Sequence, residues 1–153
     1  MIEISAPAPD FTLPQDGEDN VTLSKLAGSA VVLFFYPRDD TPGCTKESIG
    51  FSERLQEFAD AGARVFGISK DSLKKHGKFS TKHNLTVPLL SDEHDGVCEA
   101  YGIWKEKNMY GKTYMGIERT TVLIDAAGNI ARIWPKVKVA GHVEDVLEAV
   151  KSL

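Results

Sequence analysis

The sequence has few cysteines and no long apolar run. Only two cysteines occur among 153 residues, and a chain of this length buries enough surface to fold without disulfide bonds. No apolar run approaches the roughly 20 residues that cross a bilayer, so we expect no membrane-spanning segment. A chain with few cysteines and no need of a disulfide is typical of a reducing compartment, and we therefore predict a cytoplasmic location.

Strong charge and targeting signals are also missing. The net charge is only −4, and no cluster of lysine and arginine indicates a nucleic-acid surface. Residues 1–10 lack the basic and apolar regions of a secretory signal. The composition, 42% hydrophobic and 26% charged, is that of a folded protein without repeats or linkers. We predict a single domain over residues 1–153.

One stretch that is present combines a strand, a turn and the start of a helix. Ala30–Tyr36 is an apolar run that predicts a buried strand, and Pro37 ends it because proline cannot donate to a sheet ladder. Thr41 is a candidate N-cap whose hydroxyl can accept a bond from a free backbone N–H. Pro42 fits the first helical position. Cys44 is thus expected in the first turn of a helix.

This position gives Cys44 a possible chemical role. The thiolate is the reactive form of cysteine, and the free N–H groups and dipole of a helix N-terminus favour an anion. Cys44 is therefore a candidate nucleophile. The alternative is a small apolar residue packed inertly under the end of a strand.

The rest of the chain alternates between strand and helix patterns. This order predicts a central mixed sheet with helices on both faces. The Cys44 helix should continue through Phe58 and stop at Ala61-Gly62. We also expect an N-terminal hairpin (6–13 with 21–23), a strand (64–69), a helix (72–82), a short extended piece (87–91), a short helix (95–102), a loop (105–116), a hairpin (120–125 and 129–134) and a final helix (143–153).

Several spaced motifs resemble one enzyme family. Pro37-x-x-x-Thr41-x-x-Cys44 is similar to the signature of the peroxiredoxins, and Pro42-Gly43-Cys44-Thr45-x-Glu47 resembles the bacterioferritin comigratory protein class, also called peroxiredoxin Q. The likeness runs from residues 8–11 to residues 119–125. It implies a thioredoxin fold with an N-terminal β-hairpin extension. It also implies a thiol-dependent peroxidase that reduces hydrogen peroxide and organic hydroperoxides without a cofactor or a metal.

The resemblance assigns roles to four residues. Cys44 would attack the peroxide and become a sulfenic acid, Arg119 would stabilise the charge that develops on oxygen, Thr41 would reach the sulfur or the peroxide, and Pro37 would shield the sulfur from solvent. The alternatives are that Thr41 only caps the helix and that Arg119 pairs with a surface carboxylate. Glu47 is most simply a carboxylate that the helix dipole favours.

One position departs from the family. Many members of this class carry a resolving cysteine five residues after the first, where this chain has Ile49. Cys98 is the other candidate for that role, and its alternative is a half-buried structural thiol. The sequence favours a single-cysteine mechanism in which an external thiol (thioredoxin, glutaredoxin or glutathione) attacks Cys44. The resemblance also implies a monomer or weak dimer.

Two other functions use the same cysteine. A cysteine hydrolase or acyl transferase would pair Cys44 with His142 as the base, and a non-enzymatic redox sensor would pass oxidation of Cys44 to partner proteins. The spacing of His76, His83, His94 and Cys98 matches no compact zinc motif, so we expect no metal site.

An apolar cluster in the expected loop also has two interpretations. It would bind the organic part of a hydroperoxide, or it would pack as a flap on the core. The sequence favours packing for its members, which are Trp104, Met109, Tyr110, Tyr114 and Met115.

Overall fold

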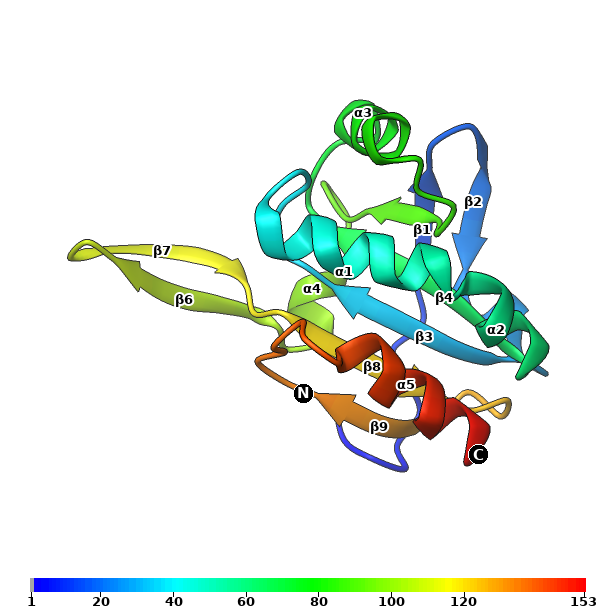
Figure 1. The fold of residues 1–153 in the computed structure, drawn as a ribbon. Helices are drawn as coiled ribbons and strands as arrows, with labels where there is room; N and C mark the ends of the chain where they lie inside the picture. The colour runs from blue at the N-terminus through cyan, green and yellow to red at the C-terminus, as the bar shows by residue number, and fades with distance from the viewer. Residues whose placement is uncertain (1) are drawn as a thin grey trace.

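The computed structural model describes residues 2–153 and is built around a seven-stranded mixed sheet (Figure 1). The strand order is β2-β1-β5-β4-β3-β8-β9, in which β3, β4 and β5 are parallel and the other pairs are antiparallel. The strands are β1 (Thr12–Gln15), β2 (Glu18–Thr22), β3 (Ala30–Phe35), β4 (Ala63–Ser69), β5 (Leu89–Ser91), β8 (Thr120–Ile124) and β9 (Ile130–Trp134).

Helices and short segments cover both faces of this sheet, as the sequence predicts. One face packs against α1 (Pro42–Glu53), α2 (Leu55–Asp60), α3 (Leu73–His83) and α5 (His142–Lys151). The other face packs against α4 (Val97–Ala100), the 3-10 helix η1 (Leu23–Leu26) and the N-terminal segment. Figure 1 shows α1, α2 and α5 together on the near side of β3.

The central strand β3 divides the two cores. All six of its residues are buried, and successive side chains of a strand point to opposite faces. Val31, Leu33 and Phe35 enter the core beside α4, and Val32 and Phe34 enter the core beside α1. Burial on both faces explains why the sequence of β3 is a continuous apolar run rather than an alternating one.

The segment from 105 to 116, expected as a loop, is instead a second hairpin. Strands β6 (Trp104–Met109) and β7 (Lys112–Ile117) pair antiparallel around Tyr110 and Gly111, whose φ values are 52° and 76°. The hairpin projects away from the body (Figure 1). Most of its residues are exposed on both faces, so the apolar-polar alternation that identifies a half-buried strand is absent.

The expected packing of the apolar cluster in this hairpin is also wrong for its outer part. Met109, Tyr110, Tyr114 and Met115 are all exposed, and Tyr110 retains 97% of its accessible surface. Only Trp104, at the base, packs against the core. The hairpin is therefore an arm, not a flap folded over the sheet.

Two smaller differences concern element boundaries. The Cys44 helix does not run unbroken to Phe58, because Arg54 leaves helical geometry (φ −105°, ψ 8°) and separates α1 from α2. The short extended piece at 87–91 contributes β5, which lies between β1 and β4. The N-terminal hairpin pairs through β1 with β5 and so extends the sheet.

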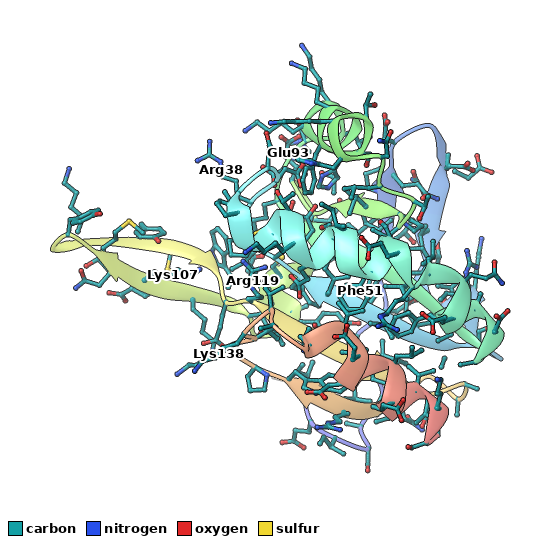
Figure 2. The ribbon with its side chains drawn as sticks, viewed as in Figure 1. Arg38, Phe51, Glu93, Lys107, Arg119 and Lys138 are labelled. Atoms are coloured by element: carbon teal, nitrogen blue, oxygen red, sulfur yellow. The ribbon has the colours of Figure 1, made fainter. Side chains whose placement is uncertain are left out.

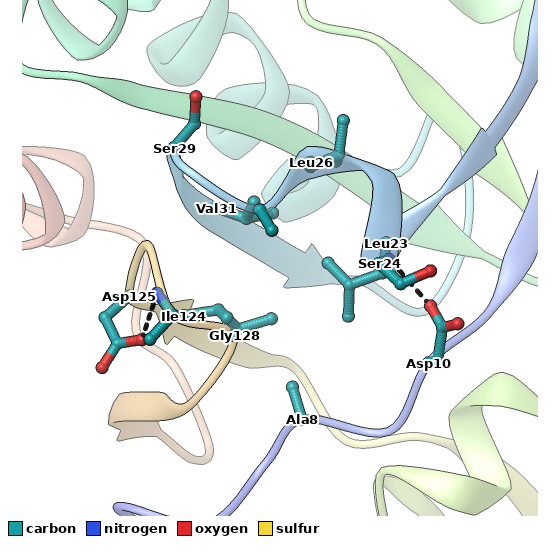
Figure 3. A pocket seen from close by; sticks show the side chains of 12 residues that line it. Ala8, Asp10, Leu23, Ser24, Leu26, Ser29, Val31, Ile124, Asp125 and Gly128 are labelled. Carbon is teal, nitrogen blue, oxygen red and sulfur yellow. Dashed lines mark hydrogen bonds between the residues drawn. The ribbon is translucent and has the colours of Figure 1, made fainter.

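A cavity of about 200 Å³ lies where β3 begins and β8 ends (Figure 3). Its two carboxylates are used in local turns. Asp10 accepts backbone N–H bonds from Phe11 and Ser24, and Asp125 accepts them from Ala127 and Asn129. Its lining includes neither a cysteine nor a histidine, so the reactive groups of the chain lie elsewhere.

Candidate active site

Cys44 lies at the start of α1, as the sequence predicts. The helix begins at Pro42, and its first backbone bond runs from Thr45 N–H to the Thr41 carbonyl. The N–H groups of Gly43 and Cys44 precede that bond and therefore have no acceptor within the helix. The Cys44 side chain is buried, with 1% of its surface exposed. The first turn of α1 thus combines free backbone N–H groups with a nearly covered sulfur.

Arg119 reaches this sulfur from the strand side. It lies between the end of β7 and the start of β8, and its Nη2 donates to Cys44 Sγ at 3.2 Å. Its backbone carbonyl accepts a bond from Val137 N–H, which holds the segment in place. A Cβ on Gly43 would lie 3.1 Å from Nη2, so glycine leaves room for the guanidinium. A charge-assisted bond of this kind holds the guanidinium against the sulfur.

Glu47 holds the other side of the guanidinium. Its Oε1 accepts from Arg119 Nη1 at 2.7 Å, and its side chain is fully buried. Burial raises the pKa of Glu47 to about 7, although the charge of Arg119 acts in the opposite direction. The sequence offered a surface carboxylate as an alternative partner of Arg119, whereas the observed carboxylate partner, Glu47, is buried. Its spacing of three residues from Cys44, one helical turn, is the signal that could have indicated it.

Thr41 and Pro37 lie near the mouth of the helix but make different contacts from those expected. Thr41 occupies the N-cap with extended geometry, yet its hydroxyl forms no capping bond and donates to the Arg38 carbonyl at 2.9 Å. The predicted cap bond is thus wrong, because the hydroxyl is turned toward the Arg38 carbonyl as a donor rather than toward the free N–H groups of α1 as an acceptor. Pro37 is exposed at the end of β3.

The turn that carries these residues is anchored by buried polar groups. Asp39 accepts from the Tyr36 hydroxyl at 2.6 Å and faces His76 Nδ1 at 2.7 Å. His76 is buried on α3, and its Nε2 lies 2.9 Å from the Leu90 carbonyl. Burial by itself lowers the pKa of His76, but Asp39 outweighs it and the net pKa is raised. These bonds join the turn to α3 and β5.

Cys98 lies on the opposite face of the sheet from Cys44. It is fully buried in α4, in the core that includes Val31 and Phe35. Its backbone N–H donates to Asp92 at 2.7 Å. Burial, followed by the charge of Asp92, raises the pKa of the Cys98 thiol well above its ordinary value. The alternative offered by the sequence was a half-buried structural thiol, and the structure buries Cys98 completely.

The structure uses His142 elsewhere. Its Nε2 lies 2.8 Å from the Thr121 hydroxyl, and its ring packs against Phe51 and Trp134. Burial lowers the pKa of His142 to about 4.

Among residues 2–153, no group of three or more histidine, cysteine or carboxylate side chains could hold a metal ion. Over the same residues, no helix has both the length and the apolar character needed to span a bilayer.

Comparison with known proteins identifies the family of this arrangement. The model of the AhpC/TSA family matches residues 4–133. The chain belongs to the AhpC/TSA family. The "putative peroxiredoxin bcp" of Coxiella burnetii is 53% identical over 146 residues, 95% of this chain and 97% of that protein. Peroxiredoxin Bcp of Bacillus subtilis is 47% identical over 152 residues, 99% and 97% of the two chains.

The solved structures that the chain resembles belong to the same class of proteins as these relatives. The bacterioferritin comigratory protein of Xanthomonas campestris has a TM-score of 0.91 at 44% identity, over 99% of this chain and 96% of that one. A cysteine-to-serine variant of PrxQ from Xylella fastidiosa has a TM-score of 0.93 at 38% identity, over 99% and 97% of the two chains. The chain therefore has the thioredoxin fold of the peroxiredoxins. As a peroxiredoxin it is an enzyme that reduces hydroperoxides with electrons from a thiol.

Proposed function

We propose that Cys44 is the nucleophile of this peroxidase and that Arg119 stabilises its transition state. The observation that carries the proposal is the 3.2 Å bond from Arg119 Nη2 to Cys44 Sγ. Arg119 is the only guanidinium within bonding distance of that sulfur among residues 2–153. Glu47 fixes the guanidinium from the other side, so the donor is in position before the peroxide arrives.

The first step transfers one oxygen atom to sulfur. The Cys44 thiolate attacks the terminal oxygen of the hydroperoxide, an S–O bond forms and the O–O bond breaks. The leaving oxygen carries the electron pair away, takes a proton, and departs as water or an alcohol. Sulfur is oxidised to a sulfenic acid. Arg119 and the free N–H groups of Gly43 and Cys44 would stabilise the negative charge on the leaving oxygen.

The positions of the two cysteines support regeneration by an external thiol. A disulfide requires Cα atoms within about 7 Å of each other, whereas Cys44 and Cys98 pack in cores on opposite faces of β3. In our proposal an external thiol attacks the Cys44 sulfenic acid, releases water and leaves a mixed disulfide. A second thiol then frees the Cys44 thiol and departs in a disulfide with the first.

The reductant, the range of substrates, the oligomeric state and the location are proposed from the sequence and from related proteins. Thioredoxin, glutaredoxin or glutathione would supply the external thiols. The structures of the Xanthomonas campestris protein address its alkyl peroxide reduction activity, which supports organic hydroperoxides as substrates beside hydrogen peroxide. Pro37 and Thr41 would form the rim through which the substrate enters. The chain would act as a single domain and as a monomer or weak dimer, and a cytoplasmic location remains a prediction.

The alternatives that use Cys44 differently have less support. A hydrolase would need His142 beside Cys44, but the Nε2 atom of His142 is held by Thr121. A non-enzymatic sensor would not need a guanidinium held between a carboxylate and the sulfur. Peroxidase turnover is therefore the function that this geometry supports best.

Mass spectrometry tests the proposal directly. One equivalent of hydrogen peroxide should add one oxygen atom to Cys44 in the intact protein and in a Cys98→Ser variant. The Cys44→Ser variant is the control and should consume no peroxide. An unmodified Cys44 in protein that still consumes peroxide would overturn the assignment.

A further inference from the structure

Lys107 is a cation near the candidate active site that the proposed mechanism does not use. It lies on β6, opposite Tyr114 of β7, in the hairpin that leads directly into Arg119. Figure 2 labels Lys107 on this hairpin and Arg119 where the hairpin meets the body of the protein. The hairpin therefore places a second positive charge on the strand side of the site, from which Arg119 also comes.

The stem of Lys107 lies across the hairpin. Its Cδ and Cε lie 3.2 and 3.4 Å from the place that a Cβ on Gly116 would occupy, and the Tyr114 ring borders the same place. Lys107 is half-buried, although its neighbours Glu106 and Asn108 are exposed. Gly116 thus leaves a channel for the methylene groups, and the ammonium is carried toward the body instead of into solvent.

The Lys107 ammonium feels the charges of the candidate site, because its stem runs over Gly116, three residues before Arg119. Burial lowers the pKa of Lys107, the charge of Arg119 lowers it further, and the charges of Cys44 and Glu118 raise it. The Arg119 guanidinium is bonded to Glu47 and to Cys44. The Lys107 side chain, by contrast, forms no ion pair or hydrogen bond with any other residue from 2 to 153. Its positive charge is available to a ligand.

We propose that Lys107 binds the anionic group of organic hydroperoxides whose organic part carries a carboxylate. This inference rests on the proposed attack by Cys44. The carboxylate of the substrate contacts the Lys107 ammonium while the O–O bond lies over the sulfur, between the free N–H groups and Arg119. Lys107 takes no part in bond making or breaking, so a neutral hydroperoxide reacts without it.

The test compares two probes of similar shape. They are cumene hydroperoxide and its derivative with a para-carboxylate, and the quantity measured is the second-order rate constant for oxidation of Cys44 by each. For each protein the rate constant for the carboxylated probe is divided by that for the neutral probe. In the Lys107→Met variant this ratio should fall about fivefold, the effect of removing one partly solvated charge contact. In the unchanged protein, added salt should lower the same ratio.

Matched variants distinguish a specific contact between Lys107 and the carboxylate from a general effect of positive charge on the hairpin. Lys112→Met removes a lysine from the exposed end of the same hairpin and should leave the ratio unchanged, and Lys107→Arg should largely restore it. Gly116→Ala displaces the Lys107 stem without removing its charge and should lower the ratio by a smaller factor.

The outcomes also separate this inference from the proposed function. An unchanged ratio in Lys107→Met, or an equal fall for both probes, overturns the role of Lys107 while leaving Cys44 as the nucleophile. If neither probe oxidises Cys44 in the unchanged protein, the proposed function itself fails.

Discussion

Arg119 Nη2 lies 3.2 Å from Cys44 Sγ although the two residues are 75 positions apart in the sequence. The antiparallel pairing of β3 with β8 produces this proximity, because Phe35 at the end of β3 pairs with Thr120 at the start of β8. The turn that carries Cys44 follows the first strand, and Arg119 precedes the second. The position of the guanidinium is thus a property of the sheet rather than of the local sequence.

Replacing Arg119 by methionine should slow oxidation of Cys44 by roughly 100- to 1,000-fold, the usual effect of losing a donor to developing charge. Stopped-flow measurement of peroxide reduction under single-turnover conditions gives the rate. Arg64→Met is a suitable control, because Arg64 is exposed over the Phe66 ring. Comparable rates in the two variants would contradict the role of Arg119.

Replacing Gly43 by alanine should separate activity from stability. The new methyl group would lie 3.1 Å from Arg119 Nη2 and push the guanidinium away from the sulfur. Alanine also favours the helix over glycine, although Gly43 is the second residue of α1 and the gain there is smaller than the roughly 1 kcal/mol of an interior position. We expect slower Cys44 oxidation with an unchanged or higher midpoint of thermal unfolding. A rate equal to that of the unchanged protein would show that the guanidinium does not need this space.

Glu47 should make stability depend on pH in a specific direction. Its pKa is about 7 in the folded protein, above the ordinary value of 4.5, so the folded state holds a proton there that the unfolded state has lost. Between pH 4.5 and 7 the contribution of Glu47 to stability should therefore fall as pH rises, by up to about 3 kcal/mol.

Urea unfolding at a series of pH values tests this prediction. In Glu47→Gln, whose side chain cannot ionise, the free energy of unfolding should lack this component. The difference between the variant and the unchanged protein should thus move in favour of the variant as pH rises from 4.5 to 7. A difference that is constant over this range would show that Glu47 titrates normally.

Cys98 should not be needed for turnover. We expect the Cys98→Ala variant to retain steady-state peroxidase activity with an external thiol reductant, because Cys98 and Cys44 lie in separate cores. Alanine leaves a small space in α4 without adding a polar group, and the cost in stability should be about 1 kcal/mol. Loss of turnover in a variant that still forms the sulfenic acid would point to a resolving role for Cys98.

Local patterns were sufficient for much of the fold. The apolar run of β3, the Thr41-Pro42 start of α1 and the helical spacing of α5 each predicted the element that the structure contains. Such patterns are informative because capping and the spacing of buried side chains within one element depend on residues that are close together in the sequence. The β6–β7 hairpin was missed because its exposure on both faces removes the burial pattern.

The candidate site was predictable only in part. Cys44 could be placed from its own helix, and Arg119 was singled out through resemblance to a family. The burial of Glu47 and its bond to Arg119 depend on packing between α1 and the start of β8, which no local pattern encodes. The contact of Lys107 with the space over Gly116 likewise depends on the register of a hairpin that was not expected.

The separation of the two sulfurs by β3 has a consequence for the catalytic cycle. An enzyme that closes a disulfide between distant cysteines must unwind part of its fold and rebuild it in every round. Here the reduced, sulfenic and mixed-disulfide forms could share one backbone, because only the atoms attached to Cys44 Sγ change. The rate of turnover would then be set by the encounter with each incoming thiol rather than by refolding. Crystals of the reduced protein should also remain intact when they are soaked in peroxide.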